Sequence, residues 1–159
     1  MFLPKIITES ITDLTPELLR QRNIRLLMLD FDNTIVPYTT DIPTPQMAQW
    51  LKDMASSDIQ ICIVSNSKRD RVPRFCEAYG LECITHAKKP FTKGIRQCLD
   101  KYGIPAENAA LAGDQIYTDM LGARRAGMKG LLVNSIDDVW YKPLRRLVEQ
   151  PFRYKEVRK

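Results

Sequence analysis

Short apolar runs alternate with helical patterns along most of the chain, and this alternation limits the possible folds more than any other feature. Strands that are separated by helical crossovers must run parallel. A parallel sheet needs helices on both of its faces. The sequence therefore predicts an α/β fold, a doubly wound three-layer sandwich around a mainly parallel five-stranded sheet. The five apolar runs are residues 26–31, 60–65, 82–85, 109–113 and 130–134.

Residues typical of helix ends fall between these runs. Thr15 and Thr44 are each followed by proline, which pairs an N-cap residue with the residue favoured at the first helical position. Gly80, Gly103 and Gly127 stand where helices should stop. These local signals agree with a repeated strand-helix order.

Composition indicates one intracellular domain. The chain has 159 residues, 44% of them hydrophobic, which is enough for a single core, and we predict one domain over residues 1–159. The four cysteines have no CxxC spacing and His86 is the only histidine, so reduced thiols are expected rather than a structural zinc site. Glu9 and Asp13 interrupt the apolar N-terminus too early for a signal peptide or a spanning helix, which predicts a cytoplasmic protein.

The two ends of the chain leave alternatives open. Residues 1–22 carry apolar side chains at loosely helical spacing, followed by a short predicted helix from Pro16. This segment either packs on the sheet or lies at a membrane interface as an amphipathic anchor. Residues 142–159 hold much of the net charge of +5. This basic C-terminal tail either favours an anionic partner, lipid or nucleic acid, or is a solvated surface.

Two carboxylates, Asp30 and Asp32, stand where the first predicted strand ends. Ligands of open α/β sheets bind beyond the carboxyl ends of the strands. Residues two apart in an extended strand face the same side, so both carboxylates can converge on one substrate. An aspartate pair can also serve as a turn and helix-start device, but that reading explains none of the polar residues that follow.

Polar residues also follow the second and third predicted strands. Ser65 can offer its hydroxyl, and its neighbour Asn66 a backbone N–H, to phosphate oxygens. A serine here can equally cap a helix, although Ser67 is as good a cap and would leave Ser65 available. Lys88 and Lys89 precede a proline, and one of them can neutralise a phosphate or a nucleophile. We favour Lys89 because Pro90 restricts its backbone to extended conformations.

The fourth predicted strand ends in Gly113 and Asp114, and Asp119 follows shortly after. Magnesium prefers oxygen ligands, and Asp114 beside Asp30 would supply carboxylates for it. Gly113 allows close approach of the backbone to a ligand. Asp119 is either a site residue or an acid favoured in the first turn of a helix.

In this order the residues resemble the four motifs of the haloacid dehalogenase-like (HAD) phosphatases. The first motif, Asp-x-Asp-x-Thr, corresponds to residues 30–34, the second to Ser65, the third to Lys89 and the fourth to residues 113–114 with Asp119. The resemblance covers residues 26–134 and implies the HAD-like, Rossmann-like fold.

The resemblance also implies hydrolysis of a phosphomonoester through an aspartyl phosphate. Asp30 would attack phosphorus, while Asp32 would protonate the leaving oxygen and later deprotonate the attacking water. Ser65, Asn66 and Lys89 would hold the phosphoryl oxygens.

Magnesium is the implied cofactor. It would bind the carboxylates of Asp30 and Asp114 and the backbone carbonyl of Asp32. The residues with supporting roles would be Thr34, Gly113 and Asp119.

Many members of the family carry a cap domain, for which this chain has no room. Residues 34–59 and 68–86 are accounted for by single loops, helices and strands, so we expect an open site and no cap. The form of residues 29–37 and 113–119 looks like the YqeG-type branch of subfamily IIIA, which is similar to the phosphatidylglycerophosphate phosphatases. That resemblance implies a phospholipid substrate, presented at the inner face of a membrane.

Two other functions stay open. One is a broad-specificity or protein phosphatase with the same mechanism. The other is a nucleic-acid or ribosome-associated binding module on the same fold, which the basic tail permits although no aromatic-basic RNA-binding motif is present. A phospho-receiver domain is disfavoured because the third predicted strand does not end in an aspartate. Oligomeric state is not predicted.

Overall fold

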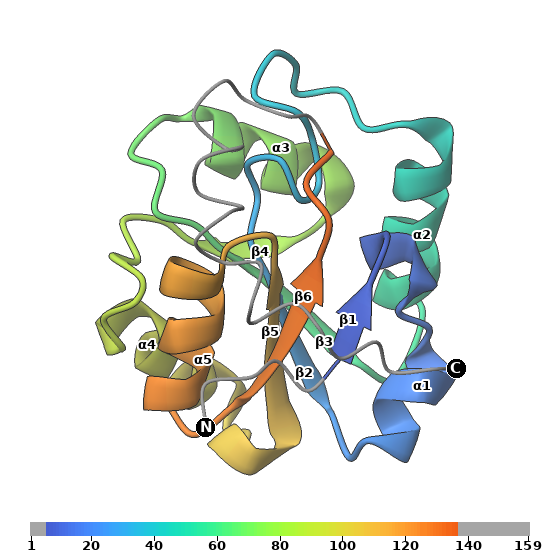
Figure 1. Ribbon diagram of the computed structural model, residues 1–159. Helices are drawn as coiled ribbons and strands as arrows, with labels where there is room; N and C mark the ends of the chain where they lie inside the picture. Colours follow the sequence, from blue (N-terminus) through green and yellow to red (C-terminus); the bar gives the residue numbers. More distant parts are fainter. Residues whose placement is uncertain (1–5, 137–159) are drawn as a thin grey trace.

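A computed structural model describes residues 6–136 of the chain (Figure 1). The basic C-terminal tail and residues 1–5 lie outside the described residues. The described chain folds around one sheet with the strand order β1-β6-β5-β2-β3-β4, in which every pair is parallel. The strands are β1 (Ile6–Thr8), β2 (Leu26–Leu29), β3 (Gln60–Val64), β4 (Glu82–Ile84), β5 (Ala109–Gly113) and β6 (Lys129–Val133).

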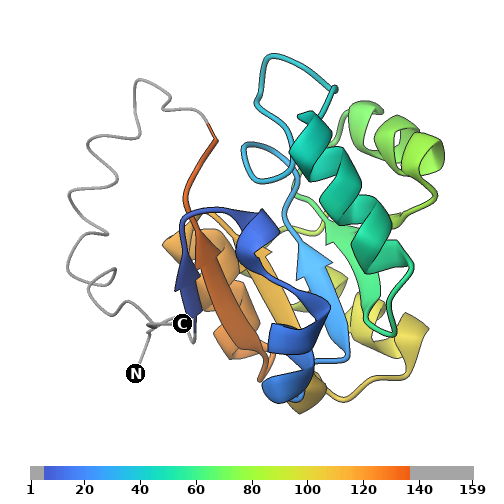
Figure 2. The same cartoon turned by 90° about the vertical axis from the view of Figure 1, so that its right-hand side faces the viewer.

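The predicted doubly wound α/β fold is confirmed, because helices cover both faces of this sheet. Leu27 and Leu29 of β2 belong to the core beneath η1, α1, α2 and α3, whereas Leu26 and Met28 belong to the core beneath α4 and α5. Figure 2 shows α1 and α2 in front of the sheet. A strand buried on both faces is apolar at every position, which explains the unbroken apolar run of β2.

The helices begin and end close to their predicted signals. Thr15 and Thr44 each accept a backbone N–H bond as N-caps, at 3.1 and 3.2 Å. Gly80 and Gly103 take the left-handed conformation that ends α3 and α4. The helices are α1 (Pro16–Gln21), α2 (Pro45–Ala55), α3 (Arg71–Tyr79), α4 (Lys93–Tyr102) and α5 (Leu121–Arg125), with 3₁₀ turns η1 (Ile11–Asp13) and η2 (Ala106–Asn108) and a π-helical turn η3 (Ile116–Met120).

The N-terminal segment differs from the loosely helical pattern of its sequence. Its described part adds β1 to the edge of the sheet, beside β6, and continues into η1 and α1. Ile6, Ile11 and Leu14 are buried in the core, and the Trp50 indole N–H of α2 donates to the Leu14 carbonyl at 2.8 Å. Of the two alternatives, packing on the sheet is therefore correct for residues 6–14. None of the helices within residues 6–136 has the length and apolar character needed to cross a bilayer.

Candidate active site

The predicted site residues meet at one edge of the sheet. Because all strands are parallel, their carboxyl ends share the edge that faces the top of Figure 1. Asp30 follows β2 at the middle of the sheet and is tied to β5 by its backbone N–H, which donates to the Ala112 carbonyl at 2.9 Å. Ser65 follows β3 and Lys89 follows β4. The segments come together because neighbouring strands end side by side.

Lys89 is the centre of a buried charge cluster. Its Nζ donates to Asp30 Oδ1 at 2.8 Å and to Asp119 Oδ1 at 2.7 Å, and its side chain is only 1% exposed. Burial lowers the pKa of the Lys89 ammonium, but the Asp119 and Asp30 carboxylates more than offset this and raise its pKa. The structure thus places Lys89 in the site, whereas Lys88 is exposed.

Asn66 fixes the backbone of Lys89 from both sides. Its Oδ1 accepts from the Lys89 N–H at 2.7 Å, and its Nδ2 donates to the Lys89 carbonyl at 2.9 Å. The side-chain amide is therefore directed at Lys89 itself. This pair of bonds holds the lysine at its place between the acids.

Three carboxylates beside Lys89 form a set of oxygen ligands suited to a cation. One oxygen of each of Asp30, Asp114 and Asp119 lies within 4.8 Å of the others, and hard divalent cations prefer such carboxylate donors. Asp114 Oδ2 accepts from the Ser135 hydroxyl at 2.6 Å. The residues fit a divalent metal, with Asp119 inside the carboxylate cluster and the Asp32 side chain outside it.

Burial and neighbouring charges shift the pKa of Asp30 and of Asp119. Burial, opposed by Lys89 and assisted by Asp114, raises the pKa of Asp30. Burial together with the Asp30 charge raises the pKa of Asp119 to about 7, although Lys89 opposes the shift. The positive charge of Lys89 favours the ionised forms of Asp30 and Asp119.

Gly113 makes room for Asp119. A Cβ atom on Gly113 would lie 2.2 Å from Asp119 Oδ2, so only glycine lets this carboxylate reach Lys89. Asp119 stands in the π-helical turn η3, and its Oδ2 accepts from the Gln115 N–H at 3.2 Å. Thr34 donates its hydroxyl to Asp30 Oδ2 at 3.4 Å. The close approach at Gly113 is thus to a side chain of the same protein.

Ser65 is buried at the end of β3, next to β2. The sequence predicted that its hydroxyl would make no local hydrogen bond, but the structure shows one. Its Oγ accepts from the Ser67 N–H at 3.0 Å. Ser67 does not cap a helix, because α3 begins only at Arg71 with Asp70 as its N-cap. A hydroxyl that accepts one bond can still donate its hydrogen to a phosphoryl oxygen, so Ser65 keeps the capacity that its predicted role requires.

Asp32 is held by a residue that sequence reasoning missed. Arg71 donates from Nη1 to Asp32 Oδ1 at 2.5 Å, and from Nε to Asp41 Oδ1 at 2.7 Å. Its Nη2 donates to the carbonyls of Pro37 and Thr40. The guanidinium therefore joins Asp32 to the loop that follows it.

The environment of Asp32 differs from that of Asp30. Partial burial raises the pKa of Asp32, and the Arg71 charge opposes the shift. Arg71 also lies over the Phe31 ring, 5.1 Å from its centroid. No motif marks Arg71 because it stands 39 positions from Asp32; a cation at the start of the helix after Ser65 is the only signal that the sequence offered.

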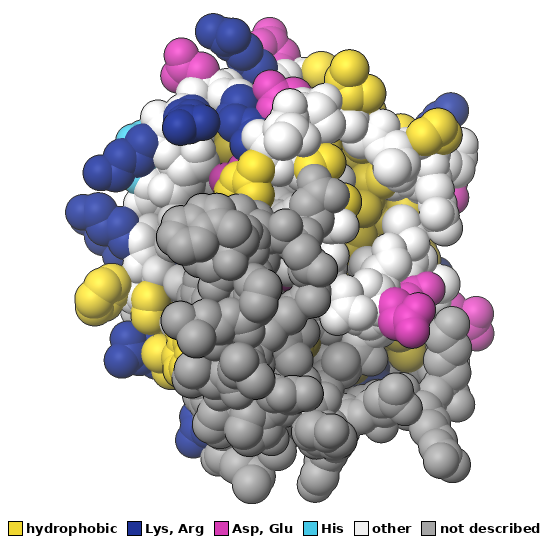
Figure 3. Space-filling view, turned by 45° about the horizontal axis from the view of Figure 1, so that its top comes forward, with side chains coloured by type: hydrophobic (Ala, Val, Ile, Leu, Met, Phe, Trp, Pro, Cys, Tyr) yellow, Lys and Arg dark blue, Asp and Glu magenta, His cyan; other side chains and the backbone are white. Residues whose placement is uncertain are grey.

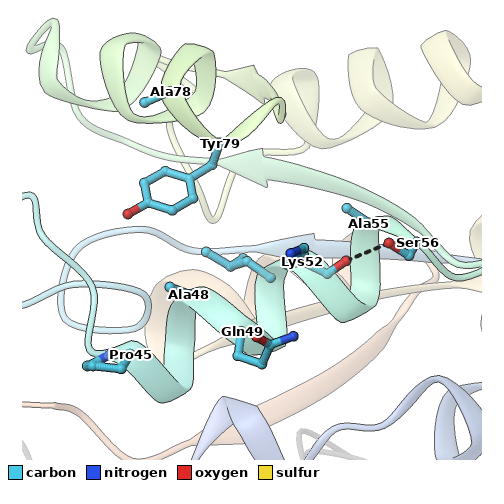
Figure 4. A pocket seen from close by; sticks show the side chains of 9 residues that line it. Pro45, Ala48, Gln49, Lys52, Ala55, Ser56, Ala78 and Tyr79 are labelled. Atoms are coloured by element: carbon cyan, nitrogen blue, oxygen red, sulfur yellow. Dashed lines mark hydrogen bonds between the residues drawn. The ribbon is translucent and has the colours of Figure 1, made fainter.

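A hollow of about 500 Å³ lies between α2 and α3 (Figure 4). Ala48, Lys52 and Ala55 line it from α2, and Ala78 and Tyr79 line it from α3. None of its lining residues belongs to the charge cluster, so it is separate from the candidate active site.

Sequence comparisons match this chain to a hydrolase family and to relatives that are named as phosphatases. The family model for haloacid dehalogenase-like hydrolases matches residues 9–133. A Bacillus subtilis (strain 168) protein named "Probable phosphatase YqeG" is 35% identical over 132 residues, which cover 83% of this chain and 77% of that protein. A glyceraldehyde 3-phosphate phosphatase of Pyrococcus furiosus is 33% identical over 69 residues, 43% of this chain and 25% of that protein.

Solved structures share the fold at low sequence identity. The cobalt-bound deoxy-D-mannose-octulosonate 8-phosphate phosphatase of Haemophilus influenzae aligns with a TM-score of 0.56 and 14% identity, over 82% of this chain and 90% of that one. A 3-deoxy-D-manno-octulosonate 8-phosphate phosphatase of Yersinia pestis aligns with a TM-score of 0.56 and 13% identity, over 82% and 75% of the two chains.

Proposed function

The chain belongs to the haloacid dehalogenase-like hydrolases and is a phosphatase of that family, and from this premise we propose that Asp30 is its nucleophile and Asp32 its general acid/base. One observation carries the proposal. Asp30 lies at the centre of the sheet's carboxyl edge, 2.8 Å from the buried Lys89 ammonium and beside two further carboxylates. A cation at that distance stabilises the ionised form of Asp30, and only the ionised form can attack phosphorus.

Hydrolysis would proceed in two steps. Asp30 Oδ forms a bond to phosphorus as the bond from phosphorus to the leaving oxygen breaks, and Asp32 gives its proton to that oxygen. Water then attacks the aspartyl phosphate, Asp32 takes a proton from it, and the Asp30 carboxylate is regenerated. Asp32 is suited to both steps because partial burial raises its pKa, which makes the protonated form accessible.

The remaining site residues would bind the phosphoryl group. Ser65 would donate from its hydroxyl and Lys89 from its ammonium, and Asn66 supports Lys89 by holding its backbone. Charge neutralisation of this kind lowers the barrier for two anions to meet. Thr34 would support the site by its hydrogen bond to Asp30. Gly113 would support it by leaving space for the Asp119 carboxylate.

Magnesium is the cofactor that we propose. Asp30, Asp114 and the backbone carbonyl of Asp32 would hold it, with Asp119 beside them, and the bound ion would supply charge neutralisation for the phosphate. The supporting observation is the set of three neighbouring carboxylates, whose oxygens lie within 4.8 Å of one another.

The substrate that we propose is phosphatidylglycerophosphate. We also propose that residues 1–159 form a single domain. Between β2 and β3 the chain forms one loop and α2, and between β3 and β4 it forms α3, so no cap domain covers the site in this part of the described structure. A site without a cap can reach a phosphate group that is attached to a macromolecule or to a membrane surface. A lipid headgroup at the cytoplasmic face of a membrane presents its phosphate in this way.

The test is phosphate release in magnesium buffer, from phosphatidylglycerophosphate in mixed micelles and from a soluble generic phosphoester. Asp30→Asn, which keeps the side chain's shape, should abolish both activities, while the matched exposed change Asp53→Asn on α2 should alter neither. Full activity of Asp30→Asn would refute the mechanism. Activity on the soluble ester alone would keep the phosphatase and discard the lipid, in favour of a broad-specificity or protein phosphatase.

A further inference from the structure

Exposed large hydrophobic side chains gather at the edge of the sheet that holds the active site. Tyr38 and Ile42 lie in the loop after β2, and Phe91 lies in the loop after β4. Tyr117 lies in η3 after β5, and Ile136 follows β6. We call these five residues the apolar rim. Among the described residues only one other large hydrophobic side chain is exposed, Tyr79 at the end of α3.

The opposite edge of the sheet lacks such residues. In the described connections 22–25, 56–59, 80–81, 103–108 and 126–128, no large hydrophobic side chain is exposed; Ile24, Ile59 and Met128 there are all buried. Scattered exposed apolar residues are normal on protein surfaces. Their concentration at one edge, around the site, is what indicates an interaction surface.

The two most exposed members of the apolar rim are held outward by ordered turns. Ile42 is 76% exposed, and its N–H donates to Thr40 Oγ1 at 3.1 Å, while Arg71 binds the Thr40 carbonyl. Phe91 is 66% exposed, and its N–H donates to the Lys88 carbonyl at 2.9 Å. Their exposure is therefore part of the folded structure.

Cations accompany the apolar rim. Lys68 and Arg69 follow β3, and Lys93 begins α4 after the Phe91 turn; all three side chains are exposed. The exposed acids of the same loops are Asp41, which Arg71 binds, and Asp70. In Figure 3, which brings this edge forward, hydrophobic and basic side chains lie along the upper part of the surface, with a few acidic side chains among them.

We propose that this edge docks on an anionic lipid bilayer, with Ile42 and Phe91 inserted among the lipids and Lys68, Arg69 and Lys93 on their headgroups. Apolar side chains within a basic surface are the combination that membrane interfaces bind. A folded protein partner would need one contiguous apolar patch. The apolar rim instead consists of separate side chains around the site, which suits insertion into a fluid bilayer. The docked site would face the headgroups directly. The proposal rests on the lipid substrate proposed above and names the residues that reach it.

Flotation of the full chain with vesicles tests the proposal. Phosphatidylcholine vesicles and an equimolar mixture with phosphatidylglycerol are compared with the wild-type sequence as the parent protein, because neither lipid carries a phosphomonoester that it could hydrolyse. Ile42→Ser with Phe91→Ser should weaken binding to the anionic vesicles by about tenfold or more. Lys68→Gln and Arg69→Gln should each weaken it by about fivefold at moderate salt and have less effect at high salt.

Matched controls keep the apolar and charge changes away from the active-site edge. Tyr79→Ser removes the exposed hydrophobic residue outside the apolar rim, and Arg124→Gln removes an exposed cation from the last turn of α5. Both should bind vesicles as the parent protein does. Circular dichroism and thermal midpoints establish that every variant is folded.

Three outcomes would overturn the proposal. They are absence of binding to anionic vesicles, equal binding by the Ile42 and Phe91 double variant, and salt-sensitive RNA binding that replaces vesicle binding. Hydrolysis of the soluble phosphoester by the wild-type chain, measured in parallel, separates these failures from failure of the phosphatase mechanism, because that activity needs no membrane.

Discussion

Gly113 is the position at which the smallest covalent change should disturb the site most. A Cβ atom there would lie 2.2 Å from Oδ2 and 2.4 Å from Cγ of Asp119. Asp119 is buried and its other oxygen accepts from Lys89 Nζ at 2.7 Å. Gly113→Ala should therefore push the Asp119 carboxylate away from the lysine that also contacts Asp30.

The size of the effect follows from the displacement that the new methyl group requires. Ordinary contact begins near 3.4 Å, so the carboxylate must move by about 1 Å. Breaking a buried ion pair costs about 3–5 kcal/mol of unfolding free energy, and a misplacement of this size costs about 10²-fold in rate. We expect losses of about 3 kcal/mol in stability and about a hundredfold in kcat/KM.

Urea unfolding and phosphate release from a soluble phosphoester measure the two losses. Gly103→Ala is the matched control. Gly103, unlike Gly113, has a positive φ, +61°, and a Cβ atom there meets no atom within 4 Å. This control should lose only about 1 kcal/mol of stability, with its activity unchanged.

A double-mutant cycle decides whether the contact is the cause. Asp119→Gly removes all three of the atoms that crowd the new Cβ of Gly113→Ala. In that background, Gly113→Ala should cost little further stability, so the two changes should be strongly non-additive. If Gly113→Ala costs the same in both backgrounds, the reasoning is refuted.

Three further predictions concern the charges of the site. Lys89→Met should abolish activity and lower the free energy of unfolding by about 3–5 kcal/mol, because it leaves buried carboxylates without a positive partner. The control Lys52→Met, at an exposed position of α2, should change neither. A stable, active Lys89→Met protein would contradict the charge cluster. Arg71→Gln should lower kcat about tenfold, because Asp32 loses its partner, and should speed chymotrypsin cleavage after Tyr38, because the loop loses its anchor; unchanged cleavage would show that Arg71 does not hold the loop. Chelation should stop hydrolysis, and magnesium should raise the Tm of the metal-free protein, since an ion that binds only the folded state stabilises it; an equal rise in Asp114→Asn would argue against the carboxylate site.

Local signals were sufficient for most of the fold. The apolar runs predicted β2 to β6 because strands buried on both faces must be apolar throughout, and Thr15, Thr44, Gly80 and Gly103 act only on backbone groups beside them. The strand β1 was missed, since three residues carry almost no periodic pattern. Its pairing with β6 joins segments that are far apart in the chain.

Sequence by itself determined which residues stand at the carboxyl ends of the strands, and hence that Asp30, Ser65, Lys89 and Asp114 would share one edge of a parallel sheet. Only the tertiary structure decided which side chains meet there. In the folded chain Lys89 is buried against Asp119, whereas Lys88 is exposed. The Asp119 carboxylate occupies the space beside Gly113, and Arg71 binds Asp32. Order along a strand follows from local periodicity, whereas these contacts depend on packing between segments distant in sequence.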